Sequence, residues 1–559
     1  MSFDGITTKA IVSELKNSII GSKVNKVYQP NKNELFLSLY NNGKNYNLNI
    51  STNPDFCRIC LSNLHKPNPQ TALNFCMLLR KYLVGGKIIN ISNFDLERTI
   101  HIKFECYNEL NDLVQRNLYI EIMSRQSNVI LTNENNIIID SLKHFEKSLP
   151  AHIYEFTKIS KKSFIDLPDF NTFLDIVNYS EKNNIIDILT NSFIGFSKDS
   201  ICSYLNILNI DNKNYSIDDL KKLYNYLKQL INNISLGKIS LLEDNNKFSV
   251  ISNENSNSFE NLDINYNTDN YYTLKEENNL FVSSRNNLLK IIMANSKKIS
   301  KKLDNINNKL AECKNMETYR LYGELLTSNL YRINQNENLD KIEIENYYDN
   351  NNLITIPLDK TFSVQKNIEK YFKKYNKLKN TLEIVGTQKQ EALLEISYIE
   401  SVLYSIENAK DFNDLNDIYF EISQNISNKL VEPSSSKTIK KKTQEPSYEF
   451  IEFNGYSIYW GKNNIQNSYL TFKFSSRNDI WFHVQKLHGS HVILKINNMD
   501  EQIPDEVLYK CAQIAKENSK ASTSLNVPVD YCKIKYVKKI PGAKPGMVNF
   551  TNYKTIIVK

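Results

Sequence analysis

The chain has 559 residues, with 69 lysines and arginines against 62 aspartates and glutamates, a net charge of +7. Because a single core stops growing at about 250–300 residues, this length predicts several domains. The sequence has no run of about 18 apolar residues and no basic start followed by an apolar core, which argues against membrane spanning and secretion. Eight scattered cysteines are typical of reduced thiols. We therefore expect a cytoplasmic protein with no membrane partner.

The first two predicted domains precede the middle of the chain. Residues 1–165 should form an α+β domain: apolar residues in 6–18 recur at helical spacing, a second helix over 71–84 ends at a glycine pair, and alternating segments around it predict strands. Residues 166–235 are predicted to be mostly helical. Within them, FIGFSKDSICSYL places a glycine turn between two short amphipathic helices, which is compatible with a helix-hairpin-helix region.

Residues 236–430 have the clearest periodicity. Apolar residues keep a 3,4 spacing over two helices predicted at about 285–330 and 363–410, the pattern of a coiled-coil seam. The segment KIEIENYYDNNNLITIPL between them predicts a β-hairpin insert, so we expect a long antiparallel arm. Helices of about 40 residues would reach roughly 60 Å. Homodimerisation through the same seam is an open alternative. A charged linker, residues 431–446, follows.

Residues 447–559 form the last predicted domain, an α+β module. From residue 446 onward the chain has 15 basic and 9 acidic residues, so most of the net positive charge lies in the last fifth. A basic terminal module is a plausible surface for RNA phosphates, and an ordinary solvated surface is an equally good explanation of the charge alone.

Three of the seven histidines lie in DIWFHVQKLHGSHVILK, residues 479–495. His483, His488 and His491 could in principle bind a metal or act as general bases. Alternating apolar residues on both sides of a Gly-Ser turn predict two strands instead, and only Asp479 adds a nearby acidic group. We therefore predict no metal and no cofactor here.

Several motifs, in order along nearly the whole chain, resemble those of the NFACT proteins. They are MSFDGITTKAIVSEL, LRKYLVGGKI, EIMSRQSNVILTN, YGELLTSNLY, GKNNIQNSYLTFK and DIWFHVQKLHGSHV. The resemblance implies an NFACT-N domain, a helix-hairpin-helix region, a coiled-coil arm and an NFACT-R domain that binds RNA. It assigns Trp481, His483 and His491 to that RNA-binding domain, with His488 where relatives usually have proline.

The resemblance also implies a role in ribosome quality control. The expected protein binds stalled 50S subunits that carry peptidyl-tRNA, and it recruits alanyl-tRNA so that alanine is added to the nascent chain without mRNA. Its expected partners are 23S rRNA, a stalk-base protein, tRNA (tRNA-Ala) and an Hsp15-like RNA-binding protein. It is not expected to be an enzyme, because the ribosome forms the peptide bond.

The tRNA-binding residues that the resemblance implies lie in the NFACT-N domain. The acidic residue of the opening motif is Asp4, and the Asp-Arg pair of the family corresponds to Glu97 and Arg98, in which the glutamate is a departure. The MGRHSN stretch of the family corresponds to MSRQSN, which retains Arg125 and Asn128 but not the glycine or the histidine. A surface ion pair is the structural alternative for Glu97 and Arg98.

Two other functions remain alternatives. NFACT-N also resembles the N-terminal domain of MutM-type DNA glycosylases, but those enzymes use a proline after the initiator methionine, and this chain has Ser2. A fibronectin-binding surface adhesin would require export, for which the sequence offers no signal.

Overall fold

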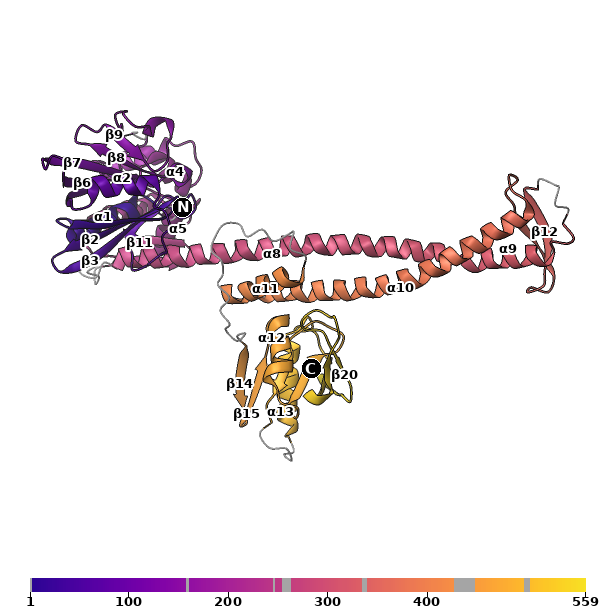
Figure 1. Cartoon of the computed structure of the whole chain (residues 1–559). Coiled ribbons are helices and arrows are strands. Elements are labelled where there is room, and N and C mark those ends of the chain that lie inside the picture. Colours follow the sequence, from indigo (N-terminus) through magenta and orange to yellow (C-terminus); the bar gives the residue numbers. More distant parts are fainter. Residues whose placement is uncertain are drawn as a thin grey trace. The chain divides into compact units, whose positions relative to one another are not determined.

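The structure is a computed structural model that describes residues 3–156, 160–244, 247–253, 263–333, 339–426, 448–496 and 503–559 (Figure 1). Its contacts divide the chain into two compact units, Met1–Asn278 and Asn279–Lys559. Helices and sheets occur in both units, so the predicted multidomain α+β class is confirmed. The predicted linker and Ser2 lie outside the described residues. No helix in the described ranges is long and apolar enough to cross a membrane.

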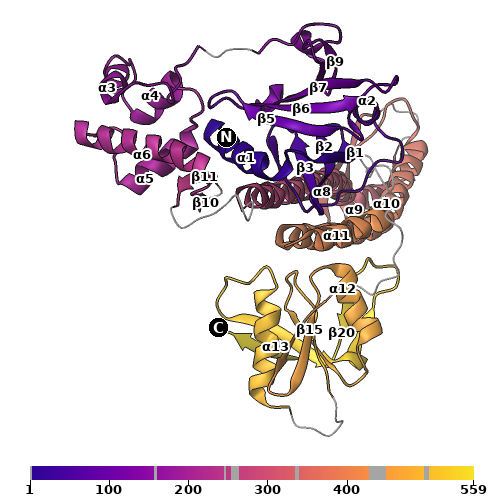
Figure 2. The same ribbon diagram turned by 90° about the vertical axis from the view of Figure 1, so that its left-hand side faces the viewer.

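A nine-stranded antiparallel sheet forms the frame of the first unit, in the order β4-β3-β2-β1-β5-β6-β7-β8-β9. Its strands are β1 (Lys23–Asn31), β2 (Glu34–Asn41), β3 (Lys44–Ser51), β4 (Arg58–Leu61), β5 (Lys87–Asn93), β6 (Thr99–Tyr107), β7 (Leu113–Glu121), β8 (Asn128–Asn133) and β9 (Ile138–Ser141). Helix α1 (Gly5–Ile19) lies against the sheet (Figure 2) and buries Ile6, Ile11 and Leu15, at the spacing that predicts a helix.

Four helices pack beside this sheet in the first unit (Figure 2). They are α3 (Phe170–Asn178), α4 (Ile185–Ser192), α5 (Lys198–Leu208) and α6 (Ile217–Leu236). Phe164 makes edge contacts with Phe173 and Phe193 in their core, at ring distances of 6.0 and 5.4 Å. A short hairpin, β10 (Ile239–Asp244) and β11 (Lys247–Ser252), follows α6. Helix α2 (Asn74–Leu83) packs on β1.

Helix α8 (Asp263–Cys313) begins inside the first unit, about twenty residues before the expected start at 285. Glu14 of α1 caps it by accepting bonds from the backbone N–H groups of Ile264 and Asn265 at 3.1 and 3.0 Å. Buried Arg58 pairs with Glu276 at 2.6 Å. Burial alone would raise the pKa of Glu276, but the positive charges of Arg58 and Lys66 lower it. Ile264, Tyr271 and Tyr272 are buried in the core of the first unit, and the buried polar groups among them interrupt the apolar pattern that marks a helix in the sequence.

The second unit contains two long antiparallel helices. Helix α8 packs along α10 (Val364–Asn408): the Arg285 guanidinium donates to the Glu407 carbonyl, and the Cys313 thiol lies 3.5 Å from the Leu378 carbonyl. A continuous apolar seam joins them; it includes Leu288, Ile292, Ile299 and Ile306 on α8 and Val385, Ala392, Ile399 and Val402 on α10. We call this helix pair, together with the two short helices and the hairpin that pack on it, the arm.

Four elements complete the arm. The helix expected over 285–330 is interrupted at residues 314–315, after which α9 (Met316–Ser328) begins. The hairpin β12 (Lys341–Asn346) and β13 (Asn352–Pro357) then pairs in regular antiparallel register. Leu325, Ile344 and Ile356 join these elements in one apolar cluster with the start of α10. Helix α11 (Phe412–Asn425) packs back on the other end of α10.

The C-terminal domain is a six-stranded antiparallel sheet in the order β14-β15-β17-β16-β18-β21. The strands are β14 (Glu449–Phe453), β15 (Tyr456–Trp460), β16 (Ile480–Val484), β17 (Val492–Leu494), β18 (Val527–Lys533) and β21 (Lys554–Val558). The two strands expected in 479–495 are β16 and β17, which pair directly. Helix α13 (Asp505–Glu517) covers one face of the sheet, and a smaller core around Trp481 lies on the other.

The C-terminal domain contacts α10 and α11 through helix α12 (Asn464–Tyr469), part of the GKNNIQN motif. The Asn464 amide donates to the buried Glu421 carboxylate at 2.9 Å and to Ser401 Oγ at 2.8 Å. The Gln466 amide donates to Asp417 at 3.0 Å. These side chains of the motif therefore hold the domain against the arm.

Burial raises the pKa of Glu421 to about 7, and the Asn464 and Tyr398 donors only partly offset that effect. A carboxyl whose folded-state pKa is raised stabilises the fold when protonated, and this stabilisation is lost as pH rises from about 4.5 through 7. We expect the contact between α11 and the C-terminal domain to lose at most about 3 kcal/mol of stability from Glu421 between pH 5 and 8. The fluorescence of Trp460 and Trp481, the two tryptophans of the chain, would follow unfolding of the C-terminal domain that this contact stabilises.

Glu421→Gln provides the control for this pH dependence. Glutamine keeps an acceptor for Asn464 and cannot ionise, so the variant should unfold at a more constant temperature across the same pH range. An unchanged pH dependence in Glu421→Gln would assign the effect to other groups, of which the neighbouring Asp417 also has a raised pKa because of burial.

Candidate nucleic-acid interface

The residues implied as tRNA-binding lie on loops at one end of the nine-stranded sheet. The N-terminus of α1, the β5–β6 loop and the α4–α5 turn meet there, because the Gly5 N–H donates to the Gly195 carbonyl at 2.9 Å. A Cβ at Gly5 would overlap the Leu96 carbonyl oxygen. The β5–β6 and β7–β8 loops are joined by a bond of 3.0 Å from the Ile122 N–H to the Arg98 carbonyl. The structure therefore brings these loops together.

Asp4 is the N-cap of α1. Its Oδ1 accepts bonds from Thr7 N and Thr7 Oγ1 at 3.0 and 3.1 Å, which is the usual way that an aspartate satisfies a helix start. Its side chain is buried, and Oδ2 has no hydrogen-bond partner among the described residues. The hydroxyls of Tyr204 and Tyr272 have strongly raised pKa values, first because of burial and then because of neighbouring charges that include Asp4. One oxygen of Asp4 thus has a structural role, and the other is a buried acceptor.

Glu97 and Arg98 follow a tight turn at the end of β5. The Glu97 N–H donates to the Phe94 carbonyl at 2.8 Å, and Asp95 between them has a left-handed φ of 48°. Glu97 is 5 % exposed, and Arg98 is half-buried just before β6. The backbone hydrogen bonds of this turn fix the positions of the Cα atoms from which the Glu97 and Arg98 side chains extend.

Arg125 lies on the β7–β8 loop and is exposed. Ser124 beside it has a left-handed φ of 54°, and its hydroxyl donates to the Pro54 carbonyl at 2.9 Å. Asn128, by contrast, is fully buried: its amide donates to the Lys143 carbonyl at 2.8 Å, and its oxygen accepts from the Lys143 N–H at 2.9 Å. As placed, Asn128 anchors the loop on which Arg125 lies, and it is not available for direct contact with RNA.

Gly5→Ala should disturb this site more than any distant glycine substitution. The added methyl group would collide with backbone atoms of Leu96 and Gly195, so the loops must separate. Overpacking of this kind costs about 1–3 kcal/mol, and a collision with backbone is at the upper end. We expect a lower unfolding temperature by circular dichroism and reduced RNA retention. Gly386→Ala, at a helical glycine with open space around it, should not lower the unfolding temperature, because alanine is favoured over glycine in a helix, and it should leave RNA retention unchanged.

Trp481, His483 and His491 form one ring cluster in the C-terminal domain. Trp481 stacks on His483 at 5.6 Å, and its edge contacts His491 at 5.2 Å. Trp481 is fully buried and His491 is 2 % exposed, whereas His483 is half-buried. Burial lowers the pKa of His483 to about 4 and that of His491 well below its usual value. Both histidines are therefore neutral near pH 7. Trp481 and His491 are buried, so they pack beneath the surface of the domain and do not form part of it.

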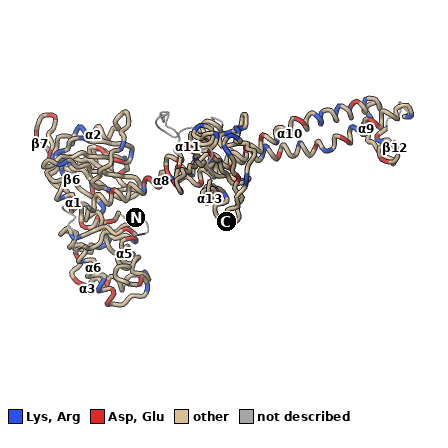
Figure 3. Tube along the Cα trace, turned by 90° about the horizontal axis from the view of Figure 1, so that it is seen from below, with Lys and Arg blue, Asp and Glu red and all other residues tan. Residues whose placement is uncertain are grey.

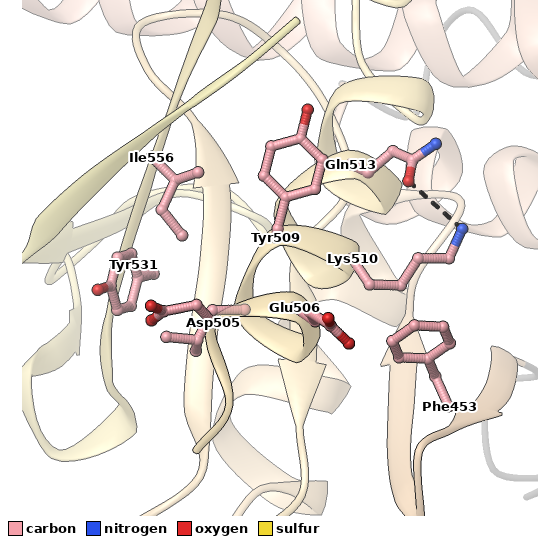
Figure 4. A pocket seen from close by; sticks show the side chains of 9 residues that line it. Phe453, Asp505, Glu506, Tyr509, Lys510, Gln513, Tyr531 and Ile556 are labelled. Atoms are coloured by element: carbon pink, nitrogen blue, oxygen red, sulfur yellow. Dashed lines mark hydrogen bonds between the residues drawn. The ribbon is translucent and has the colours of Figure 1, made fainter. Parts of the chain in front are cut away.

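The described residues contain no group of three or more His, Cys, Asp or Glu side chains that could hold a metal ion. An open groove of about 580 Å³ lies between α13 and the sheet of the C-terminal domain (Figure 4). Phe453, Tyr509 and Tyr531 line it, and its charged lining residues are Asp505, Glu506 and Lys510. Because two carboxylates outweigh the one cation, the groove does not favour a nucleic-acid backbone.

Sequence reasoning missed the residues that join α8 to the sheet. Glu14, Arg58 and Asp269 are buried ionisable groups, and the Arg58 guanidinium lies 3.7 Å from Asp269. Nothing local in the sequence marks them, because their partners lie more than 200 positions away.

Comparisons with known proteins identify the family. Residues 4–444 match the model of the NFACT N-terminal and middle domains, and residues 447–552 match that of the NFACT protein RNA binding domain. The chain is 33% identical to "Rqc2 homolog RqcH" of Bacillus subtilis. The alignment extends over 578 residues and covers 100% of this chain and 98% of that relative. The chain is 30% identical over 575 residues to the protein of the same name in Streptococcus pneumoniae, with the same coverage.

Two shorter similarities accompany these matches. "Coiled-coil domain-containing protein 25" of Bos taurus is 36% identical over 109 residues, which are 19% of this chain and 52% of that protein. The solved C-terminal part of the fibronectin/fibrinogen-binding protein from Streptococcus suis is 29% identical and covers 50% of this chain and 94% of that one, with a TM-score of 0.39. From the family models and the full-length relatives together, the chain belongs to the NFACT family.

Proposed function

We propose that this chain is a ribosome-associated quality control factor of the cytoplasm. It binds large ribosomal subunits that hold peptidyl-tRNA after a stall, and it recruits alanyl-tRNA for mRNA-independent alanine tailing. The observation that carries this proposal is the full-length similarity to Rqc2 homologues, combined with the meeting of the Asp4, Arg98 and Arg125 loops at one sheet end. The finer points, including the identity of the tRNA, follow from family resemblance.

In this proposal the loops at the sheet end hold the tRNA. Arg98 and Arg125 are the cationic donors, suited to phosphates or base edges, and Arg125 is already exposed. Asp4 and Glu97 are acceptors, suited to base amino groups or to orienting Arg98. Asn128 acts through the Arg125 loop, since its own amide is engaged. Unpaired bases of a tRNA loop offer the accessible edges that such a set can read.

The arm is proposed to bind the subunit through 23S rRNA and a stalk-base protein. Lysines of SKKISKKL and KKYNKLK, including Lys298, Lys301 and Lys373, are exposed, whereas Ile299 is buried in the seam. Figure 3 marks basic residues along the trace of the arm, with acidic residues among them. Exposed lysines on a stiff helix can neutralise phosphates, so binding should weaken with salt. An Hsp15-like RNA-binding protein is a further proposed partner.

The ribosome itself would form the peptide bonds, and this chain would contribute binding and positioning. The glycosylase alternative depends on residue 2, which lies outside the described residues, and no observation favours the adhesin. Sequencing the RNA that copurifies with the chain tests the proposal: we expect tRNA, enriched in tRNA-Ala, together with large subunits. Purification without tRNA or large subunits would contradict the proposed function.

A further inference from the structure

The positive charge of the C-terminal domain is concentrated in its last 27 residues. Residues 448–532 contain eight basic and nine acidic side chains, so that part is nearly neutral. Residues 533–559 contain seven lysines and no acidic residue. A charge asymmetry this sharp within one domain produces a local positive potential, which the net charge of the whole chain conceals.

Most of these lysines project from one small structure. The end of β18 leads into β19 (Val537–Lys539), which pairs with β20 (Val548–Phe550), and β21 follows. We call residues 533–554 the lysine ribbon. Its five exposed lysines are Lys533, Lys535, Lys538, Lys539 and Lys554. Lys544, in the loop between β19 and β20, instead donates to the Asn425 carbonyl of α11 at 2.6 Å.

The exposed lysines of the ribbon have no acidic partner among the described residues, unlike Lys462 and Lys495 of the same domain. Lys462 pairs with Glu449 at 2.6 Å, and Lys495 pairs with Asp479 at 3.0 Å. Within the described ranges, no ion pair joins any of the five ribbon lysines to a carboxylate. Their charges are therefore available to a ligand.

The buried ring cluster supports this ribbon. Phe550 of β20 packs on Trp481 at a ring distance of 4.9 Å, and Tyr553 meets the edge of Phe550 at 5.2 Å. Val537 is buried in the same core, while Lys538 and Lys539 after it are both exposed. The contact with Phe550 restrains the ring of Tyr553 on one side. The Tyr553 side chain is still 49 % exposed, so its ring remains accessible.

We propose that the lysine ribbon is an RNA-backbone site, in which Lys535, Lys538 and Lys539 contact phosphates and Tyr553 stacks on an unpaired base. Lysines supply the sequence-independent attraction to phosphate, and an exposed aromatic ring is the usual platform for a base. Trp481, His483 and His491 then act as positioning residues beneath the ribbon. An acidic protein surface would use the lysines but would have no need of the tyrosine ring. This inference rests on the RNA-binding part of the proposed function.

The test uses the full chain carrying Arg98→Ala, so that the N-terminal loops contribute little. The probe is a fluorescent 20-nucleotide single-stranded RNA of mixed sequence, and its affinity is measured by anisotropy over a range of salt. Each phosphate contact to a single strand adds about 0.7 to the slope of log K against log salt. Lys538→Ala with Lys539→Ala should therefore lower that slope by roughly 1.4, with a several-fold loss of affinity at low salt.

Lys510→Ala with Lys520→Ala is the matched control. These two lysines belong to the same domain but lie in and after α13, on the opposite face of the sheet, and the charge change is the same. Tyr553→Ala should weaken binding at least about fivefold without a change in slope, and Tyr553→Phe should bind as the parent does. Unchanged tryptophan fluorescence would show that each variant is folded.

Equal slopes in the ribbon variant and the control would overturn the proposal. So would equal binding of a 20-residue polyglutamate peptide together with insensitivity to Tyr553→Ala, a result that assigns the ribbon to acidic protein surfaces. Failure of the proposed function is distinguishable: the parent chain would then lack copurifying tRNA and large subunits, while the ribbon variants would still differ from the control on the RNA probe.

Discussion

Arg98→Ala is expected to reduce the tRNA retained by the chain about 10- to 100-fold, because hydrogen bonds to a charged group are each worth about 1.5–3 kcal/mol. The guanidinium offers five donors in a planar fork and can grip a phosphate or a base edge at two points. Lysine provides only a point charge, so Arg98→Lys should also be impaired. The measurement is tRNA per purified complex, quantified by sequencing and gel analysis.

Arg116→Ala is the matched control for Arg98. Arg116 belongs to β7 of the same sheet, where its guanidinium lies 5.5 Å from the Tyr82 ring centre, away from the converging loops. Subunit binding should be unaffected in both variants, since it is assigned to the arm. Normal tRNA loading in Arg98→Ala would show that Arg98 serves the fold and that the site is elsewhere.

The acidic members of the site need a design that separates binding from folding. Asp4→Ala should also eliminate tRNA retention, but removing an N-cap costs about 0.5–2 kcal/mol, so lost binding alone would be ambiguous. Asp4→Asn keeps an oxygen for Thr7 and removes the charge. Weak binding in Asp4→Asn with an unchanged unfolding temperature would assign the carboxylate to the ligand. Glu97→Asp, which restores the usual family pair, should be tolerated or mildly impaired.

Removing the far part of the arm is expected to weaken binding to large subunits. Because Cys313 and Leu378 face each other across the helix pair, residues 314–377 can be replaced by a Gly-Ser connection of about four residues. The seam from Leu288 to Ile306 remains intact in this variant. Cosedimentation with purified 50S particles should fall because Lys373 and its neighbours are removed, although Lys298 and Lys301 remain, and tRNA retention should be unchanged. Unchanged cosedimentation would exclude residues 314–377 from the subunit contact.

Periodicity in the sequence predicted the arm because its stabilising contacts repeat every three or four residues. The seam residues Ile292, Ile299 and Ile306 are buried at that spacing. The first twenty residues of α8 could not be found in this way, since Arg58, Glu14 and Lys66 hold them from distant segments. The break after Cys313 also has no glycine or proline to announce it.

Prediction of the candidate sites was limited for a different reason. Motif order indicated Asp4, Glu97 and Arg98, but burial depends on tertiary packing, so the sequence could not reveal that Asn128 is enclosed. In the C-terminal domain, histidines and tryptophan attracted attention because they are rare. The lysine count after residue 533 was visible in the sequence, yet only pairing in β19 and β20 shows that those lysines share one ribbon.

The apolar stripe of α8 in the second unit constrains the helical phase of that helix. Leu288, Ile292, Ile299 and Ile306 all lie in the seam with α10. Each residue of an α-helix advances the side chains by about 100°, so one residue inserted between Ile292 and Ile299 would turn the rest of the stripe away from α10 by that angle. An insertion of seven residues would nearly restore the alignment. We therefore expect the seam to accept inserted residues only in steps close to whole pairs of turns.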